Sequence, residues 1–119
     1  MYLIMDIMVS PAGVGLSISP YVAHCQKIFQ AANLNHQLHS FGTNVEGEWD
    51  QVMAAVKRCH IELHEMGAVR ITSHIKLGTR VDREQTIQDK IDSVLEKSDS
   101  SRALHNVASE SKTRKKPAI

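Results

Sequence analysis

Aromatic residues are scarce in this chain and make up only 4% of its 119 residues. One tryptophan, two tyrosines and two phenylalanines leave little material for the stacked aromatic platforms on which many RNA-binding domains hold bases. Charge of one sign is not in surplus either, because 14 Lys and Arg residues oppose 13 Asp and Glu residues. A nucleic-acid binder normally carries a basic face, so the sequence predicts no nucleic-acid partner.

Long apolar runs are also missing from the sequence. No run approaches the roughly 20 residues that a membrane helix needs. The apolar stretch Tyr2–Val9 is short, is interrupted by Asp6 and has no basic region before it, so it predicts a strand and not a signal peptide. We therefore expect a soluble domain with no membrane partner.

Cysteine is rare, with Cys25 and Cys59 the two in the chain. Two cysteines do not make a disulfide framework. Both occupy apolar positions of predicted helices, so we expect buried free thiols, which are typical of a reducing compartment. No Asn-x-Ser/Thr glycosylation acceptor is present, which agrees with a cytoplasmic location.

The apolar periodicity divides the chain near Lys97. Residues 1–97 hold nearly all of the periodic pattern and predict one folded domain. Residues 98–119 are Ser-rich, lack aromatic residues and end in a Lys/Arg cluster. Such a segment cannot bury enough apolar surface to offset its ordering entropy. We predict a disordered polar and basic tail over 98–119.

Within residues 1–97, strand and helix patterns alternate. Ser19 before Pro20 predicts a helix start with a hydroxyl N-cap, and Asp82 with Gln85 predicts a capping box for a later helix. The predicted strands cover residues 2–9, 35–41, 43–46 and 69–77, with helices from about residues 19, 48 and 82. This order predicts an α+β, ferredoxin-like βαββαβ fold with an extra C-terminal helix and an antiparallel four-stranded sheet.

The first predicted strand is apolar on both faces, which indicates that both faces are covered. A chain of this size covers one sheet face with its own helices. The second face then needs another subunit, so we expect self-association to a dimer or tetramer.

Three motifs that often carry chemistry are weak here. Gly13-x-Gly15 lacks the third glycine and the parallel βαβ unit of a dinucleotide site. His60 and His64 have the spacing of a metal chelate, but they lie on or beside an apolar stripe, which favours packing or surface roles. A cysteine–histidine nucleophile is disfavoured because both thiols are predicted to be buried. We predict no metal site, no cofactor and no catalytic residue.

The segment from Ser40 to Asp50 is the most distinctive part of the sequence. It gathers two glycines, two hydroxyls and the only tryptophan around a tight turn and a helix start. One interpretation is a hairpin turn followed by an acidic helix N-terminus. The other is a small-molecule pocket, in which Ser40 and Thr43 fix a polar heterocycle, Glu46 accepts from an amino group or pairs with a cation, and Trp49 or Phe41 forms an apolar wall.

Several short motifs, in their order and spacing, resemble a known family over residues 3–97. They are Ser17-Ile18-Ser19, Tyr21-Val22-Ala23, Gly42-Thr43, Glu46-Gly47, Trp49-Asp50, Val69-Arg70-Ile71 and Gly78-Thr79-Arg80. The family is that of small ferredoxin-like thiamine-binding proteins, with bacterial, archaeal and fungal members. The resemblance implies dimers assembled into homotetramers, binding of thiamine or its hydroxymethylpyrimidine part, and no established catalysis.

We therefore expect a non-enzymatic protein that sequesters, delivers or senses thiamine or a related pyrimidine. The predicted ligand-binding residues are Ser17, Ser40, Gly42, Thr43, Glu46 and Trp49. Two alternatives stay open: an oligomeric interaction module without a physiological ligand, and a small enzyme that acts on a pyrimidine with Glu46 or a histidine as its acid–base group.

Overall fold

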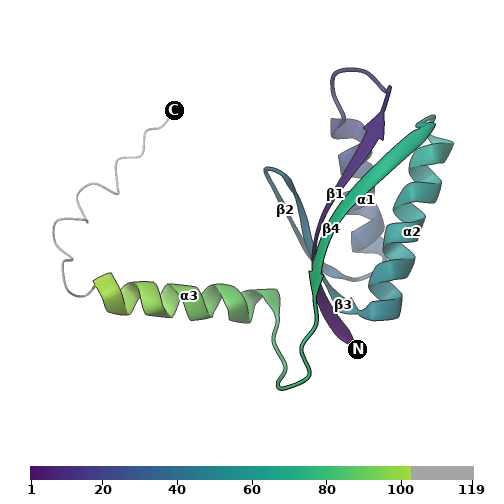
Figure 1. Ribbon diagram of the computed structural model, residues 1–119. Coiled ribbons are helices and arrows are strands. Elements are labelled where there is room, and N and C mark those ends of the chain that lie inside the picture. The colour runs from purple at the N-terminus through teal and green to yellow at the C-terminus, as the bar shows by residue number, and fades with distance from the viewer. Residues whose placement is uncertain (103–119) are drawn as a thin grey trace. The chain divides into compact units, whose positions relative to one another are not determined.

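The computed structural model describes residues 1–102 (Figure 1). Its elements, in chain order, are β1 (Tyr2–Ala12), α1 (Ser19–Ala31), β2 (Asn35–His39), β3 (Gly42–Glu48), α2 (Trp49–Glu65), β4 (Arg70–Gly78) and α3 (Ile87–Arg102). The chain forms two compact units, one from Met1 to Thr86 and one that begins at Ile87. None of the described helices is long and apolar enough to span a membrane.

The predicted ferredoxin-like fold is confirmed in the first unit. Its four strands are all antiparallel and are ordered β2-β3-β1-β4. Helices α1 and α2 cover one face of this sheet (Figure 1). The other face, which we call the open face, carries no helix from residues 1–86.

The core lies between the sheet and the two helices. Alternate residues of β1 point into it, because side chains of a strand alternate between its faces. From β1, Leu3, Met5, Ile7 and Val9 are buried there. They belong to one apolar cluster with side chains of the helices and of β3, including Cys25, Ile28, Phe29, Val45, Val52, Cys59 and Leu63. The two helices thus take up the apolar surplus of one face of β1.

The remaining residues of β1 lie on the open face. Met8 and Tyr2 are exposed there, and Asp6 is directly opposite Asn44 of β3 on one side and Lys76 of β4 on the other. His74 is opposite Met8. Polar and apolar residues alternate in the sequence of β4, and this register places the polar His74 and Lys76 on the open face.

Two predicted features at the first helix are wrong in detail. The chain between β1 and α1 is shorter than predicted, because β1 continues through Pro11 to Ala12. Pro11 is tolerated there because this end of β1 pairs with β4 alone, as proline is tolerated at a sheet edge. The N-cap residue is Ile18, and it makes no side-chain cap hydrogen bond. The Ser17 Oγ accepts a hydrogen bond from the Ser19 backbone N–H at 3.4 Å.

The predicted capping box at Asp82 and Gln85 is also wrong, because Arg80 engages both side chains. Arg80 donates to both carboxylate oxygens of Asp82, at 2.6 and 2.7 Å, and to Gln85 Oε1 at 3.1 Å. The guanidinium holds the pKa of Asp82 at about 2. Helix α3 accordingly begins later, at Ile87.

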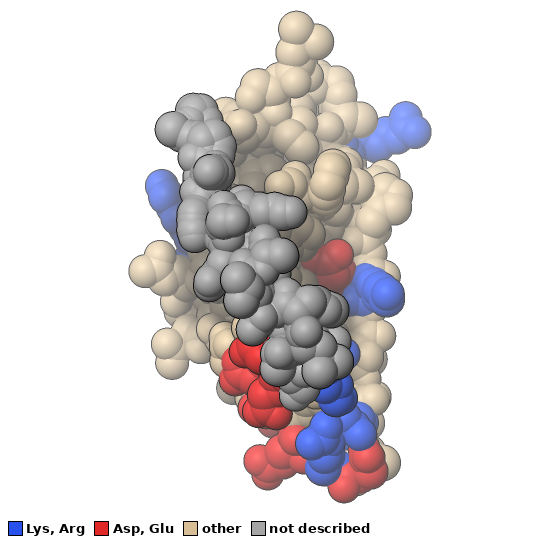
Figure 2. Space-filling model, turned by 90° about the vertical axis from the view of Figure 1, so that its left-hand side faces the viewer, with Lys and Arg blue, Asp and Glu red and all other residues tan. Residues whose placement is uncertain are grey.

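Helix α3 runs to Arg102 and so crosses the domain boundary predicted after Lys97. The rest of the predicted disordered tail, 103–119, lies outside the described residues. In the view of Figure 2, red and blue side chains of described residues lie next to one another in the lower part of the molecule. Side chains of both signs are thus visible among the described residues in this view.

Candidate functional site

A shallow depression of about 360 Å³ lies on the open face of the sheet. It is lined by Asp6, Met8, Phe41, His74, Ile75 and Lys76. The lining comes from β1, from β4 and from the turn between β2 and β3, so it is the sheet register that brings these residues together. Its volume is at the lower end of the range of small-molecule sites, which is roughly 300–1,000 Å³.

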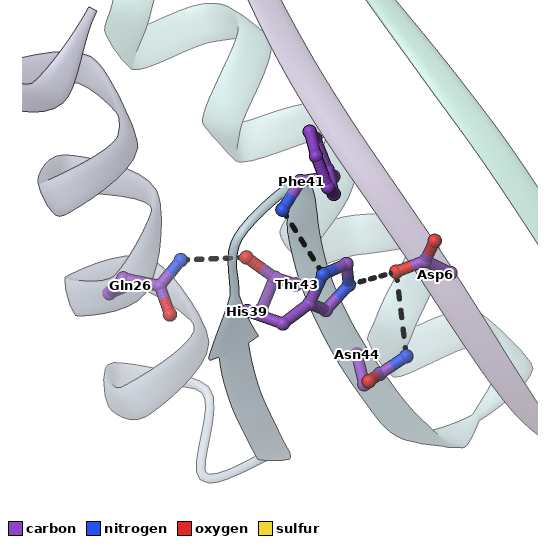
Figure 3. Close-up of polar contacts among 6 residues, drawn as sticks. All are labelled: Asp6, Gln26, His39, Phe41, Thr43 and Asn44. Carbon is purple, nitrogen blue, oxygen red and sulfur yellow. Dashed lines mark hydrogen bonds and ion pairs between the residues drawn. The ribbon is translucent and has the colours of Figure 1, made fainter. Parts of the chain in front are cut away.

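The Asp6 carboxylate is held in place by one side chain from β2 and one from β3 (Figure 3). The His39 Nε2 lies 2.5 Å from Asp6 Oδ1, and the Asn44 side-chain amide donates to the same oxygen at 3.4 Å. The Phe41 backbone N–H donates to His39 Nδ1 at 3.3 Å, which assigns the imidazole proton to Nε2. His39 therefore donates to Asp6, and the second carboxylate oxygen accepts no hydrogen bond from the described residues.

Phe41 connects this network to the depression. Its backbone binds His39, while its ring is 82% exposed and lines the depression. An exposed aromatic ring beside a fixed carboxylate is a suitable surface for a flat heterocycle that carries an amino group or a positive charge.

Glu46 is another carboxylate on the open-face side of the sheet, but it is only 2% exposed. The Asn35 side-chain amide donates to its Oε2, and the Tyr2 hydroxyl donates to the same carboxylate. Burial, together with this hydrogen bond, raises the pKa of Tyr2 to about 12. Glu46 thus has protein donors of its own, in contrast to the second oxygen of Asp6.

Thr43, predicted to share a pocket with Glu46, lies on the opposite face of β3. It is 4% exposed and accepts a hydrogen bond from the Gln26 side-chain amide of α1 at 2.9 Å (Figure 3). The two residues are three positions apart, an odd number, so strand geometry points them to different faces.

The other predicted ligand residues are also dispersed. Ser17 precedes α1, Ser40 is in the turn between β2 and β3, and Trp49 is the first residue of α2, where its backbone N–H donates to the Met1 carbonyl at 2.7 Å. Gly42 packs its Cα against the backbone of β1. The structure does not bring these residues into one cavity, and their contact with a ligand stays a prediction.

Sequence reasoning did not select Asp6, His39, His74 or Lys76 as site residues. Asp6 is a charged residue inside an apolar predicted strand. His74 and Lys76 are polar residues of the predicted strand 69–77, in which polar and apolar residues alternate. The missing information was the register, which places Asp6 opposite Lys76 and Met8 opposite His74.

The histidines of α2 are engaged with the protein. His60 Nε2 lies 2.6 Å from Ser73 Oγ, and His64 Nδ1 donates to the Ala68 carbonyl at 2.6 Å. Among the described residues, no group of three or more His, Cys, Asp or Glu side chains is arranged to hold a metal ion. The geometry of His60 and His64 agrees with the packing and surface roles favoured by their sequence positions.

The surfaces of α1 and α2 are joined by an ion pair. His24 Nε2 lies 2.7 Å from Glu62 Oε1, and Arg58 Nε lies 2.5 Å from Glu62 Oε2. The Arg58 and His24 hydrogen bonds lower the pKa of Glu62. Beneath this pair, Cys25 and Cys59 are buried free thiols, as predicted. The hydrogen bond to Cys25, and burial, raise the pKa of Cys59, which disfavours its thiolate.

Comparison with known proteins places this geometry in a family. Residues 5–95 match the model of the family described as "Thiamine-binding protein". A UPF0045 protein of Synechocystis sp. is 53% identical over 94 residues, 79% of this chain and 78% of the relative. A UPF0045 protein of the fungus Eremothecium gossypii is 42% identical over 98 residues, 82% of this chain and 93% of the relative.

Two solved structures share the fold. A hypothetical protein of Methanocaldococcus jannaschii superposes with a TM-score of 0.73 at 28% identity, over 78% of this chain and 95% of that protein. A Thermotoga maritima protein described as a thiamine biosynthesis or salvage protein gives a TM-score of 0.69 at 19% identity, over 79% and 99%. The resemblance seen in the sequence is thereby confirmed: this chain belongs to the thiamine-binding protein family.

Proposed function

We propose that this chain binds thiamine, or its hydroxymethylpyrimidine part, in the open-face depression and does not transform it. The family match supports the ligand class. The observation that carries the proposal is the Asp6 carboxylate, which His39 and Asn44 hold through one oxygen beside the exposed Phe41 ring. Thiamine joins an aminopyrimidine to a positively charged thiazolium. A fixed carboxylate suits both groups, and Phe41 supplies an aromatic face.

Substitution of Asp6 tests this assignment. Asp6→Asn should weaken binding of thiamine about tenfold or more, because a hydrogen bond to a charged group contributes roughly 1.5–3 kcal/mol and about 1.4 kcal/mol corresponds to one decade. Isothermal titration calorimetry with thiamine and with hydroxymethylpyrimidine measures the change. Asp50→Asn, in the first turn of α2, is the matched control and should leave both affinities unchanged.

Glu46→Gln distinguishes Asp6 as the ligand's acceptor from Glu46, the acceptor predicted from the sequence alone. With Asp6 as the acceptor, Glu46→Gln changes the melting temperature more than the affinity, because Glu46 is buried against Asn35 and Tyr2. A tenfold loss of affinity in folded Glu46→Gln, with Asp6→Asn unaffected, would transfer the acceptor role to Glu46 and refute the assignment to Asp6.

A role as an interaction module is the alternative that a specific observation favours. Met8 and Phe41 are exposed apolar residues that line the depression, and Tyr2 is a further exposed apolar residue at the other end of β1 on the open face. In this alternative, we propose that self-association to a dimer or tetramer covers this face in place of a bound ligand. A stable obligate interface buries more than roughly 2,000 Å². The buried free thiols of Cys25 and Cys59 support a reducing, cytoplasmic setting for this assembly.

Light scattering at micromolar concentration should therefore give two or four times the chain mass of 13.3 kDa. Met8→Glu should lower the mass, because it places a charge in the proposed interface. A monomer mass for the unaltered protein would contradict self-association.

The third possibility, an enzyme that acts on a pyrimidine, finds less support in the geometry. Both ring nitrogens of His39 are engaged, one by Asp6 and one by the Phe41 backbone. His39 is thus arranged to position a carboxylate and not to shuttle a proton. Incubation with labelled ligand should return it unchanged.

A further inference from the structure

The open-face depression holds charges of both signs that do not neutralise one another. Asp6 and Lys76 are directly opposite on adjacent strands, where Cβ atoms are about 4.5–5.5 Å apart and an ion pair is readily formed. The Asp6 carboxylate is instead bound by His39 and Asn44, from the strands on its other side. The Lys76 side chain makes no ion pair or hydrogen bond with the described residues. The carboxylate and the ammonium are therefore both available to one ligand.

A second donor lies beside Lys76 on the same strand face. His74 and Lys76 are two positions apart on β4 and both line the depression. Alternate residues of a strand are about 7 Å apart along it, a span that the oxygens of one phosphate group bridge. Within the part of the chain that the structure describes, the His74 side chain likewise has no hydrogen-bond partner. Two unengaged nitrogen donors on one side of a small site make a suitable phosphate subsite.

The ligand must then carry an amino group or a cation at one end and an anion at the other. We propose that the depression selects the phosphate ester of its pyrimidine or thiamine ligand over the free alcohol, with the phosphate on Lys76 and His74 and the amino heterocycle on Asp6 and Phe41. This inference rests on the function proposed above. In hydroxymethylpyrimidine monophosphate the amino and phosphate-bearing groups are on neighbouring ring positions, which matches acceptor and donors on neighbouring strands.

Calorimetry in phosphate-free buffer tests the selectivity with four probes: hydroxymethylpyrimidine, thiamine and the monophosphate of each. We expect each ester to bind at least about tenfold more tightly than its alcohol, the effect of one charge-assisted hydrogen bond. Lys76→Gln should remove this preference, so that each ester binds this variant no more tightly than its alcohol does. Lys57→Gln, an exposed lysine of α2, is the matched control and should keep it.

The outcomes separate this inference from the proposed function. Alcohols that bind as tightly as their esters would overturn the phosphate subsite and leave the binding function intact. Failure of all four probes to bind would overturn both. A preference for the esters that survives in folded Lys76→Gln and in His74→Gln would refute the assignment of the phosphate to these two side chains.

Discussion

Phe29→Ala should lower the free energy of unfolding by about 3–5 kcal/mol, the usual cost of removing a buried aromatic ring. Phe29 is 1% exposed and is one of the largest fully buried side chains of the core. It packs α1 onto the sheet, and its ring centroid lies 5.9 Å from that of His36. Small domains are stable by only about 5–15 kcal/mol. Urea denaturation followed by circular dichroism should show a large fall in the midpoint.

The chain contains its own control for this substitution. Phe41→Ala removes the same ring from a position that is 82% exposed, and exposed substitutions usually change stability by no more than about 0.5 kcal/mol. Phe41→Ala should instead weaken ligand binding, because Phe41 lines the depression. Equal stability of the two variants would contradict the assignment of Phe29 to the core.

Much of the fold could be predicted because local signals agree with the tertiary structure. Asn33 and Gly67 follow the first two helices, and both are residue types that favour the left-handed backbone with which helices commonly end. Their φ angles are 58° and 108°. The period of two in the sequence of β4 indicates its two faces: Ile71, Ser73 and Leu77 are half-buried, whereas Ile75, on the same face, is exposed.

Prediction failed where one local signal competed with another. Asp82 and Gln85 have the spacing of a capping box, but the guanidinium of Arg80 is two residues from Asp82 and offers a charged partner. A bidentate pair with a charged donor is stronger than a hydrogen bond to a backbone amide. Helix α3 therefore begins downstream of both residues.

The candidate site could be predicted only in part, because it depends on pairing between strands that are distant in sequence. Thr43 and Glu46 are an odd number of residues apart on one strand, so their side chains point to opposite faces of the sheet. This spacing alone was sufficient to exclude a pocket shared by the two residues. The proximity of Asp6, His39 and Lys76 requires the register of three strand pairs. Composition and spacing do not contain that register.

Gly42→Ala should destabilise the protein by about 3 kcal/mol, the upper end of the usual cost of overpacking. A Cβ at this position would lie 2.6 Å from the Ile7 carbonyl oxygen and 3.2 Å from its carbon. These are backbone atoms of the central strand, next to the Ile7–Thr43 pair of the β1–β3 ladder, so they cannot yield without disturbing the sheet.

Gly78→Ala is the control, because a Cβ there meets no atom within 4 Å. Thermal denaturation should show a fall of more than about 10 °C for Gly42→Ala, since 1 kcal/mol shifts the melting temperature of a small domain by about 4–8 °C, and little change for Gly78→Ala. The added methyl group would also lie 3.5 Å from the His39 ring, which holds Asp6. Any folded fraction of Gly42→Ala should therefore bind ligand more weakly. Equal melting temperatures for the two variants would show that the contact between β3 and β1 is looser than described.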